Sequence, residues 1–200
     1  MTSPLPPRAP GDLRHPTPTS LDELFALYEE HGQRNVGDDV SIVEHALQCA
    51  DLAVADGATD ELIVAALFHD VGWFVTGEGA RDHLLTDHHA AAGARILDPI
   101  FGAAVAQPVA LHVTAKRWRC TIDPDYYDEL SEGSKVTFIA QGGPLGTDER
   151  ASFEAHPGFV TAMALRSWDD RAKVRGRTVR GLAHYRVRAL GVARRHASGA

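Results

Sequence analysis

The feature that most limits how this chain can fold is one apolar segment that ends in a histidine and an aspartate. Residues 60–71 read DELIVAALFHDV, and the apolar positions recur at the spacing of one helical face that also includes His69. This face predicts that His69 points into the core, with Asp70 beside it. A buried imidazole and carboxylate are costly unless a partner compensates them, and a metal ion is the natural partner.

The other patterned segments are helical as well. Apolar residues recur at helical spacing in 21–30, 42–56, 88–97, 108–116, 131–140, 148–155 and 159–169. Ser20 and Thr59 are expected N-caps, Ser41 begins a capping box with Glu44, and Pro108 suits the first turn of a helix. No alternating strand pattern of convincing length is present. We therefore predict an all-α fold, a helical bundle.

Composition and charge divide the chain into three parts. Residues 1–19 are rich in Pro, Ser and Thr and predict a disordered leader without the apolar core of a secretory signal. Residues 20–170 form the predicted domain. Residues 171–200 hold nine Lys or Arg and no acidic residue, although the whole chain has a net charge of −7. We expect a basic C-terminal helix or tail that is solvated, the alternative being contact with an acidic partner or nucleic acid.

Several classes of protein are disfavoured. No apolar run is long enough to span a membrane, and the basic tail has only one aromatic residue, Tyr185, so we expect neither a membrane protein nor a nucleic-acid partner. The two cysteines, Cys49 and Cys120, are too few for a disulfide framework, which favours a cytoplasmic protein. A homodimer is left open beside a monomer.

Six residues on successive predicted helices could form one metal cage. Four imidazoles and two carboxylates suit first-row metals such as Fe, Mn, Co or Zn better than Ca or Mg. Six ligands exceed the needs of one ion, and a carboxylate flanked by ligands on both sides can bridge two ions. The predicted ligands are His45, His69, Asp70, His89, His112 and Asp169, with Asp70 as the bridge.

A single histidine on an apolar face is more often a core residue than a ligand. Five other histidines have no such support, namely His31, His83, His88, His156 and His184. His88 competes with His89, and the helical register behind the pair favours His89. What favours the six is their order along the chain, which is the motif of the HD superfamily.

The resemblance is closer to one subfamily. Six segments resemble the HD-domain mixed-valent diiron oxygenases that break the carbon–phosphorus bond of hydroxylated aminoalkylphosphonates: EHALQCA, AALFHDVG, HHAAAGARIL, HVTAKR, LSEGSKVTFIAQGGP and LRSWDD. The resemblance implies two iron ions (Fe2+/Fe3+), with His45, His69 and Asp169 on one ion, His89 and His112 on the other, and Asp70 between them.

The resemblance also implies a reaction. Dioxygen would be the co-substrate, an iron-superoxo species would take hydrogen from C1 of a hydroxylated phosphonate, and the products would be phosphate and a carboxylic acid. Lys116, one turn after His112, and Arg166, three residues before Asp169, are cationic donors, while Ser134 and Thr137 share a helical face. These four would bind the phosphonate oxygens. Asp70 and Lys116 are the predicted catalytic residues.

Three positions depart from the family. Asn35 stands where the characterised phosphonate-cleaving members have a tyrosine that caps an iron, and Trp73 stands where they have a histidine. Asp38 resembles the carboxylate that recognises the substrate amine, but is shorter than the usual glutamate. We therefore expect a different substrate tail. Trp73 and Asp38 could accommodate a bulky cation, or Trp73 could be core packing.

Two alternatives to the oxygenase stay open. The same donors would serve a metal-dependent phosphohydrolase of nucleotides or phosphate esters, in which metal-bound hydroxide attacks phosphorus. A non-catalytic HD module is the other, and the full set of six ligands argues against it.

Overall fold

The described part of the chain is helical. The computed structural model describes residues 15–35, 40–76 and 88–199, and within them there is no strand. This confirms the prediction of an all-α fold. The helices are α1 (Leu21–His31), α2 (Ile42–Ala55), α3 (Asp60–Phe68), α4 (Trp73–Thr76), α5 (His89–Phe101), α6 (Ala103–Ile122), α7 (Pro124–Glu129), α8 (Glu132–Ala140), α9 (Thr147–Glu154), α10 (Phe159–Arg171) and α11 (Leu182–Gly199).

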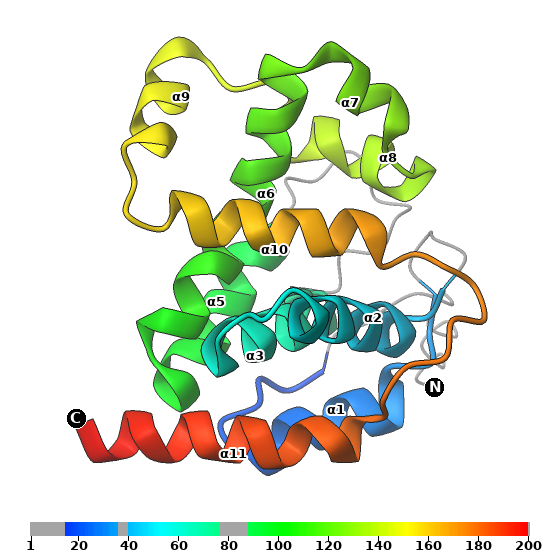
Figure 1. The fold of residues 1–200 in the computed structure, drawn as a ribbon, viewed down its shortest axis with the longest axis vertical. Coiled ribbons are helices and arrows are strands. Elements are labelled where there is room, and N and C mark those ends of the chain that lie inside the picture. Colours follow the sequence, from blue (N-terminus) through cyan, green and yellow to red (C-terminus); the bar gives the residue numbers. More distant parts are fainter. Residues whose placement is uncertain (1–14, 36–39, 77–87, 200) are drawn as a thin grey trace, which may run out of the picture.

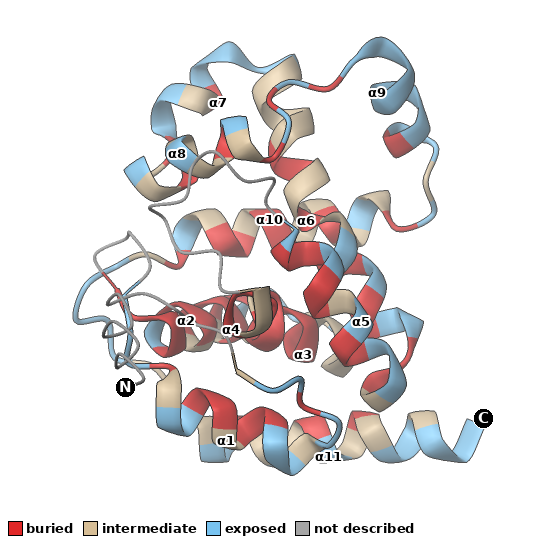
Figure 2. Cartoon of the chain, turned by 180° about the vertical axis from the view of Figure 1, so that it is seen from behind, coloured by how far each residue is buried: buried red, intermediate tan, exposed pale blue. Residues whose placement is uncertain are grey.

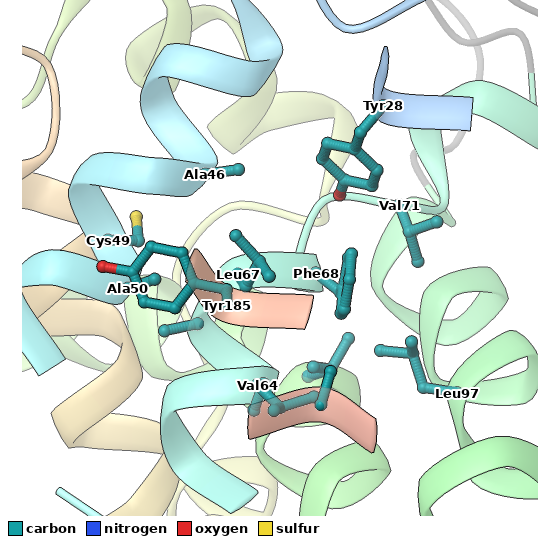
Figure 3. Packing of buried hydrophobic residues seen from close by; sticks show 14 of the residues in the cluster. Tyr28, Ala46, Cys49, Ala50, Val64, Leu67, Phe68, Val71, Leu97 and Tyr185 are labelled. Carbon is teal, nitrogen blue, oxygen red and sulfur yellow. The ribbon is translucent and has the colours of Figure 1, made fainter. Parts of the chain in front are cut away.

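Helix α3 lies at the centre of the packing. It contacts α2, α6, α10 and α11, and its residues from Ile63 to Phe68 are all buried (Figure 2). The core around it includes Tyr28, Val64, Phe68, Leu97 and Tyr185, which come from α1, α3, α5 and α11 (Figure 3). Helices α1 and α11 lie at one end of the molecule and α7, α8 and α9 at the other (Figure 1). The His-Asp pair at the end of α3 therefore enters a fully formed core.

The predicted N-caps at Ser20, Ser41 and Thr59 are confirmed. The Ser41 hydroxyl accepts from the Glu44 amide at 3.3 Å, and the Glu44 carboxylate accepts from the Ser41 amide at 2.8 Å, which completes the capping box. Ser20 and Thr59 likewise cap α1 and α3 through their side-chain oxygens. Each cap satisfies amides that have no partner within the helix.

The predicted start of the helix at Pro108 is wrong. Helix α6 begins at Ala103, and Pro108 lies inside it, just as Pro99 lies inside α5. The break between the two helices is made by Gly102, whose φ of 80° is a left-handed conformation that favours glycine. A proline this close to the start of a helix removes one backbone hydrogen bond, a cost that the packing of α6 on α3, α5 and α10 outweighs.

The basic tail is not a solvated arm. Within residues 171–199, helix α11 buries Tyr185, Ala189 and Val192 in the main core and contacts α1, α3 and α5. Its charges face acidic residues of this same chain: Arg186 pairs with Asp22 on α1, and Arg195 pairs with Glu61 on α3. The sequence left open that this segment contacts an acidic partner. Asp22 and Glu61, in the first turns of α1 and α3, are acidic partners within the chain itself.

Residues 1–14 of the predicted leader lie outside the described residues. Within the described part of the chain, no helix is both long and apolar enough to cross a membrane.

Candidate metal centre

The six predicted ligands converge on one site from five parts of the fold. His45 comes from α2, His69 and Asp70 from the end of α3, His89 from the first turn of α5, His112 from the middle of α6, and Asp169 from the last turn of α10. All four imidazoles are buried, and His69 is fully so. Their Nε2 atoms and the carboxylate oxygens fall into two clusters.

The first cluster joins His45, His69 and Asp169 with one oxygen of Asp70. The Nε2 atoms of His45 and His69 are 3.2 Å apart, and His45 Nε2 lies 3.2 Å from Asp169 Oδ1. Asp70 Oδ2 lies 3.3 Å from His69 Nε2 and 3.7 Å from His45 Nε2. These four atoms therefore surround one small volume.

The second cluster joins His89 and His112 with the other oxygen of Asp70. Their Nε2 atoms are 3.0 Å apart, and Asp70 Oδ1 lies 3.3 Å from His89 Nε2 and 3.8 Å from His112 Nε2. The two oxygens of Asp70 thus face different clusters, which is the arrangement of a bridging carboxylate. This grouping matches the one that the family resemblance implied, while the ligand roles stay a prediction.

The spacing of these atoms fits metal coordination. Two ligands bonded to one ion at about 2.1 Å, with angles of about 90° to 109°, lie about 3.0 to 3.4 Å apart. The nitrogen and oxygen donors suit a first-row transition metal, as expected. Each cluster has fewer protein atoms than an octahedral ion would bind, so further ligands from outside the protein could complete the coordination.

Backbone carbonyls orient three of the imidazoles. The Nδ1 atoms of His45, His69 and His112 lie 3.0, 2.9 and 2.7 Å from the carbonyl oxygens of Ala172, Ala66 and Val109. Donation of the Nδ1 proton to these carbonyls leaves the Nε2 lone pair directed into the cluster, the tautomer that a metal ligand requires. His89 is held differently, by a stacked contact with the Trp73 ring at a centroid distance of 4.3 Å.

The charges around the site favour the metal-binding protonation state for three of the predicted ligands and oppose it for His69. Burial lowers the pKa of His69, but Asp70 and then Asp169 outweigh this and raise the pKa above its usual value. Burial lowers the pKa of His112, and the neighbouring His89 and His69 lower it further, to about 3. Burial raises the pKa of Asp70, but His69 and His89 outweigh this and hold the pKa well below the usual range. For Asp169, burial also raises the pKa, and Arg166, followed by His45, brings it well below the usual range. His112 is therefore neutral and both aspartates are ionised, as metal binding requires.

A close backbone contact joins the two clusters. Gly72 follows Asp70 by two residues, and a Cβ on Gly72 would lie 1.9 Å from the carbonyl oxygen of His89. Only glycine permits this approach of the α3 end to the start of α5. His89, and not the exposed His88, therefore faces the cluster, as the helical register predicted.

A cavity of about 70 Å³ opens beside both clusters. It is lined by all the predicted ligands except His69, by an apolar wall and by the predicted phosphonate-binding residues. Besides the ligands, the lining includes Ile42, Trp73, Val113, Lys116, Ser134, Thr137, Gln141, Arg166 and Lys173. The structure thus brings all four predicted phosphonate-binding residues to the same space as the metal clusters.

Three of these four residues have contacts that sequence reasoning did not anticipate. Lys116 Nζ donates to Thr137 Oγ1 at 2.9 Å, and the Thr137 hydroxyl lies 3.1 Å from the Gly133 carbonyl, to which it can donate. Thr137 therefore orients Lys116. Arg166 donates to Asp169 Oδ2 at 2.8 Å and, through Nε, to Asp170 Oδ1 at 2.9 Å. Arg166 thus holds the predicted ligand Asp169, and its side chain also lines the cavity.

The three positions that depart from the family are placed as follows. Trp73 lines the cavity, is 9% exposed and stacks on His89. Asn35 is exposed. Asp38 lies outside the described residues.

Two residues near the centre were missed. Cys49 Sγ lies 3.8 Å from His45 Nε2, one helical turn away, so the spacing could have indicated it. Burial, and then Asp169 and Asp70, raise the pKa of its thiol well above the usual range. Cys49 forms a group of possible ligand atoms with His45 and His69. The second missed residue is Lys173, which lines the cavity. It follows Asp169 by four residues, but α10 ends at Arg171, so the helical spacing does not indicate its position.

The other described histidines lie away from the clusters. His31 stacks on His15 at a centroid distance of 3.9 Å, His156 accepts from the Gly158 amide, and His184 packs its ring against Tyr185. His83 lies outside the described residues.

Comparison with known proteins agrees with this site. Residues 42–141 match the HD domain family. The chain is 44% identical to hydroxymethylphosphonate dioxygenase of Gimesia maris over 168 residues. This aligned region covers 82% of this chain and 84% of that protein. It is 35% identical over 156 residues to 1-hydroxy-2-(trimethylamino)ethylphosphonate dioxygenase (glycine-betaine-forming) of Leisingera caerulea, covering 76% and 80%.

The fold and the paired clusters define an HD-domain metalloenzyme, and these similarities show that the chain belongs to the HD-domain phosphonate oxygenase family. It is accordingly an oxygenase, as the resemblance of its motifs predicted.

Proposed function

We propose that this protein is a diiron oxygenase that converts a small 1-hydroxylated organophosphonate and dioxygen into phosphate and a carboxylate. The observation that carries the proposal is the position of Asp70, whose Oδ2 and Oδ1 face two separate clusters at 3.3 Å from His69 and from His89. Such a carboxylate serves a pair of ions better than a single ion. The two phosphonate dioxygenases among the relatives support the substrate class.

The residues would hold the two ions in the predicted grouping. His45, His69 and Asp169 would bind one iron ion, His89 and His112 the other, and Asp70 both. The bound iron pair would supply the redox chemistry with dioxygen. The chain itself would fix the ligand tautomers through the carbonyls of Ala66, Val109 and Ala172, and would keep bulk water out with the buried wall of α2 and α6.

The polar end of the cavity supports an anionic substrate. Lys116 and Arg166 border it as cations, both 3% exposed or less, and Ser134 lines the same cavity. A phosphonate dianion has three acceptor oxygens and would be oriented by these donors with its carbinol carbon toward the clusters. Catalysis by these residues would consist of placing C1 and neutralising charge.

The apolar wall favours a substrate with a short tail. Ile42, Trp73 and Val113 line it, and the Trp73 ring occupies space beside His89. Hydroxymethylphosphonate has no tail beyond its carbinol carbon, and it is the substrate named for the relative that is 44% identical. The balanced reaction would be hydroxymethylphosphonate plus dioxygen to formate, hydrogen phosphate and a proton. The C–P bond and one C–H bond break, and each product gains one oxygen atom.

The test begins with protein purified without oxygen. We expect two iron ions per chain, a ferrous–ferric EPR signal after partial oxidation that changes when hydroxymethylphosphonate is added, and oxygen uptake matched by phosphate release. Turnover of 1-hydroxy-2-(trimethylamino)ethylphosphonate should be much weaker. Zinc or manganese as the bound metal, together with hydrolysis of p-nitrophenyl phosphate and no oxygen uptake, would overturn the proposal in favour of a phosphohydrolase.

A further inference from the structure

Lys173, in the segment that follows α10, is a second lysine at the polar end of the cavity. Its side chain borders the same space as Lys116 and Arg166. Its Nζ donates to Ser134 Oγ at 2.8 Å and to Ser131 Oγ at 2.9 Å, at the start of α8. Neither the motif spacing nor the similarity to known proteins gives this lysine a role.

The backbone on both sides of Lys173 is anchored to α2. The carbonyl of Ala172 contacts Nδ1 of His45 at 3.0 Å. On the other side of Lys173, the backbone of Val174 is held by the buried side chain of Gln48. The Gln48 amide accepts from the Val174 N–H at 3.0 Å and donates to the Val174 carbonyl at 2.9 Å. The position of Lys173 is therefore fixed relative to the predicted ligand His45.

Helix α8 presents two hydroxyls one turn apart, each paired with a lysine from another element. Thr137 accepts from Lys116 of α6 at 2.9 Å, and Ser134 accepts from Lys173 at 2.8 Å. The two hydroxyls differ in their own protons. The Thr137 hydroxyl can donate its proton to the backbone carbonyls of Gly133 and Ser134. Within the described residues, the Ser134 hydroxyl makes no hydrogen bond besides the one that it accepts from Lys173. The proton of Ser134 thus remains to be donated into the cavity.

Lys173 and Ser134 also border a second, polar cavity of about 350 Å³. Arg119, Arg171, Glu129 and Asp170 are among its other lining residues. The side chain of Lys173 therefore borders both cavities.

We propose that Lys173, together with Ser134, binds the anionic head group of the substrate from the side opposite Lys116. The inference rests on the proposed function for the identity of the substrate, but the chemistry requires only a phosphoryl dianion. Such a dianion has three acceptor oxygens and about two negative charges. Lys116, Arg166 and Lys173 supply three cations around it, and the bond from Lys173 makes the Ser134 hydroxyl a stronger donor. Lys173 is thus a substrate-binding residue.

The test measures anion binding apart from turnover. Inorganic phosphate is titrated calorimetrically into metal-loaded wild type, Lys173→Met, Lys173→Arg and the control Lys135→Met. Lys135 lies on α8, the helix that carries Ser134, but it pairs with Glu132 and does not line the cavity. We expect phosphate affinity to fall by on the order of tenfold or more in Lys173→Met, the loss typical of one charge-assisted hydrogen bond. Lys173→Arg should recover most of it, and Lys135→Met should match wild type.

Unchanged phosphate affinity in Lys173→Met, or no phosphate binding by wild type, overturns the inference. If Lys173→Met loses metal or melts earlier, Lys173→Gln is measured instead, because glutamine keeps a donor for the serines but removes the charge, and the same criterion applies. In turnover, Lys173→Met should raise KM far more than it lowers kcat. If wild type binds phosphate through Lys173 but does not consume oxygen with hydroxymethylphosphonate, the proposed function fails while this inference stands.

Discussion

Gly72 lies so close to His89 that a Cβ at residue 72 would stand 1.9 Å from the His89 carbonyl oxygen. This contact joins the end of α3, which carries His69 and Asp70, to the first turn of α5. The two metal clusters share Asp70, so their separation depends on how closely these two backbones approach. A glycine within the HD motif therefore sets the geometry of the site without contributing a ligand.

The first prediction concerns this contact. Gly72→Ala should displace His89, because the obstructing atoms are backbone and cannot rotate away. Metal content by elemental analysis should fall from two ions toward one, with the loss in the cluster of His89 and His112, and turnover should fall with it. Gly181→Ala is the matched control, since a Cβ there meets nothing within 4 Å. Two ions retained by Gly72→Ala would contradict this account.

The second prediction concerns the shared carboxylate. Asp70→Asn keeps the size of the side chain but removes the charge that faces both clusters. Because loss of an outer partner of a metal ligand already costs about 10–100-fold in affinity or activity, loss of the bridge should lower turnover by more than about 100-fold. Both ions should bind more weakly in a chelator competition. Asp169→Asn, which faces only the first cluster, should weaken one ion selectively.

The third prediction separates Thr137 from Ser134. Thr137→Val should act through Lys116, because the hydroxyl accepts from Lys116 Nζ at 2.9 Å. We expect KM for the phosphonate to rise by roughly tenfold, with Thr137→Ser close to wild type. In a double-mutant cycle, Thr137→Val should add little to the effect of Lys116→Met, because both substitutions remove the same hydrogen bond between Lys116 and Thr137. Additive losses would mean that Thr137 contacts the substrate independently.

Local sequence signals predicted much of this structure. The caps at Ser20, Ser41 and Thr59 depend on contacts within four residues, and the choice of His89 over His88 depends on the periodicity of one helix. The caps and the helical register are properties of single segments, which is why a single sequence reveals them. The six ligands could be predicted as a set because their order along the chain is the motif of the HD superfamily.

What could not be predicted depends on contacts between distant segments. The start of α6 at Ala103 is set by Gly102 and by packing on three other helices, which outweigh the local preference of Pro108. Docking of α11 follows from Tyr185 and Val192 meeting α1 and α3. Lys173 reaches the cavity only because His45 and Gln48 hold the chain that follows α10. None of these relationships leaves a periodic pattern in the sequence.

The fourth prediction concerns stability. Arg166 is 2% exposed and binds both Asp169 and Asp170, so Arg166→Met removes the cation beside the buried carboxylate of Asp169, while Asp170 keeps its pair with Arg119. Removing one partner of a buried ion pair costs about 3–5 kcal/mol, and we expect the free energy of unfolding of the metal-free protein to fall by that amount in urea. Arg171→Met breaks the exposed pair with Asp56 and should cost at most about 1 kcal/mol. Equal costs would show that Arg166 does not act as a buried partner.

The last prediction concerns Trp73 and the choice of substrate. Its ring stacks on His89 at 4.3 Å and narrows the apolar side of the cavity, so Trp73→Ala should admit a larger tail. We expect kcat/KM to shift by at least tenfold from hydroxymethylphosphonate toward 1-hydroxy-2-(trimethylamino)ethylphosphonate. Trp73→Phe retains an aromatic face for His89 and separates the loss of stacking from the gain of space. If the preference stays the same while two ions remain bound, the ring only packs against His89 and does not select the substrate. If instead wild type already prefers the trimethylamino substrate and loses this preference in Trp73→Ala, the indole face recognises the cation, as one of the two sequence-based alternatives predicted.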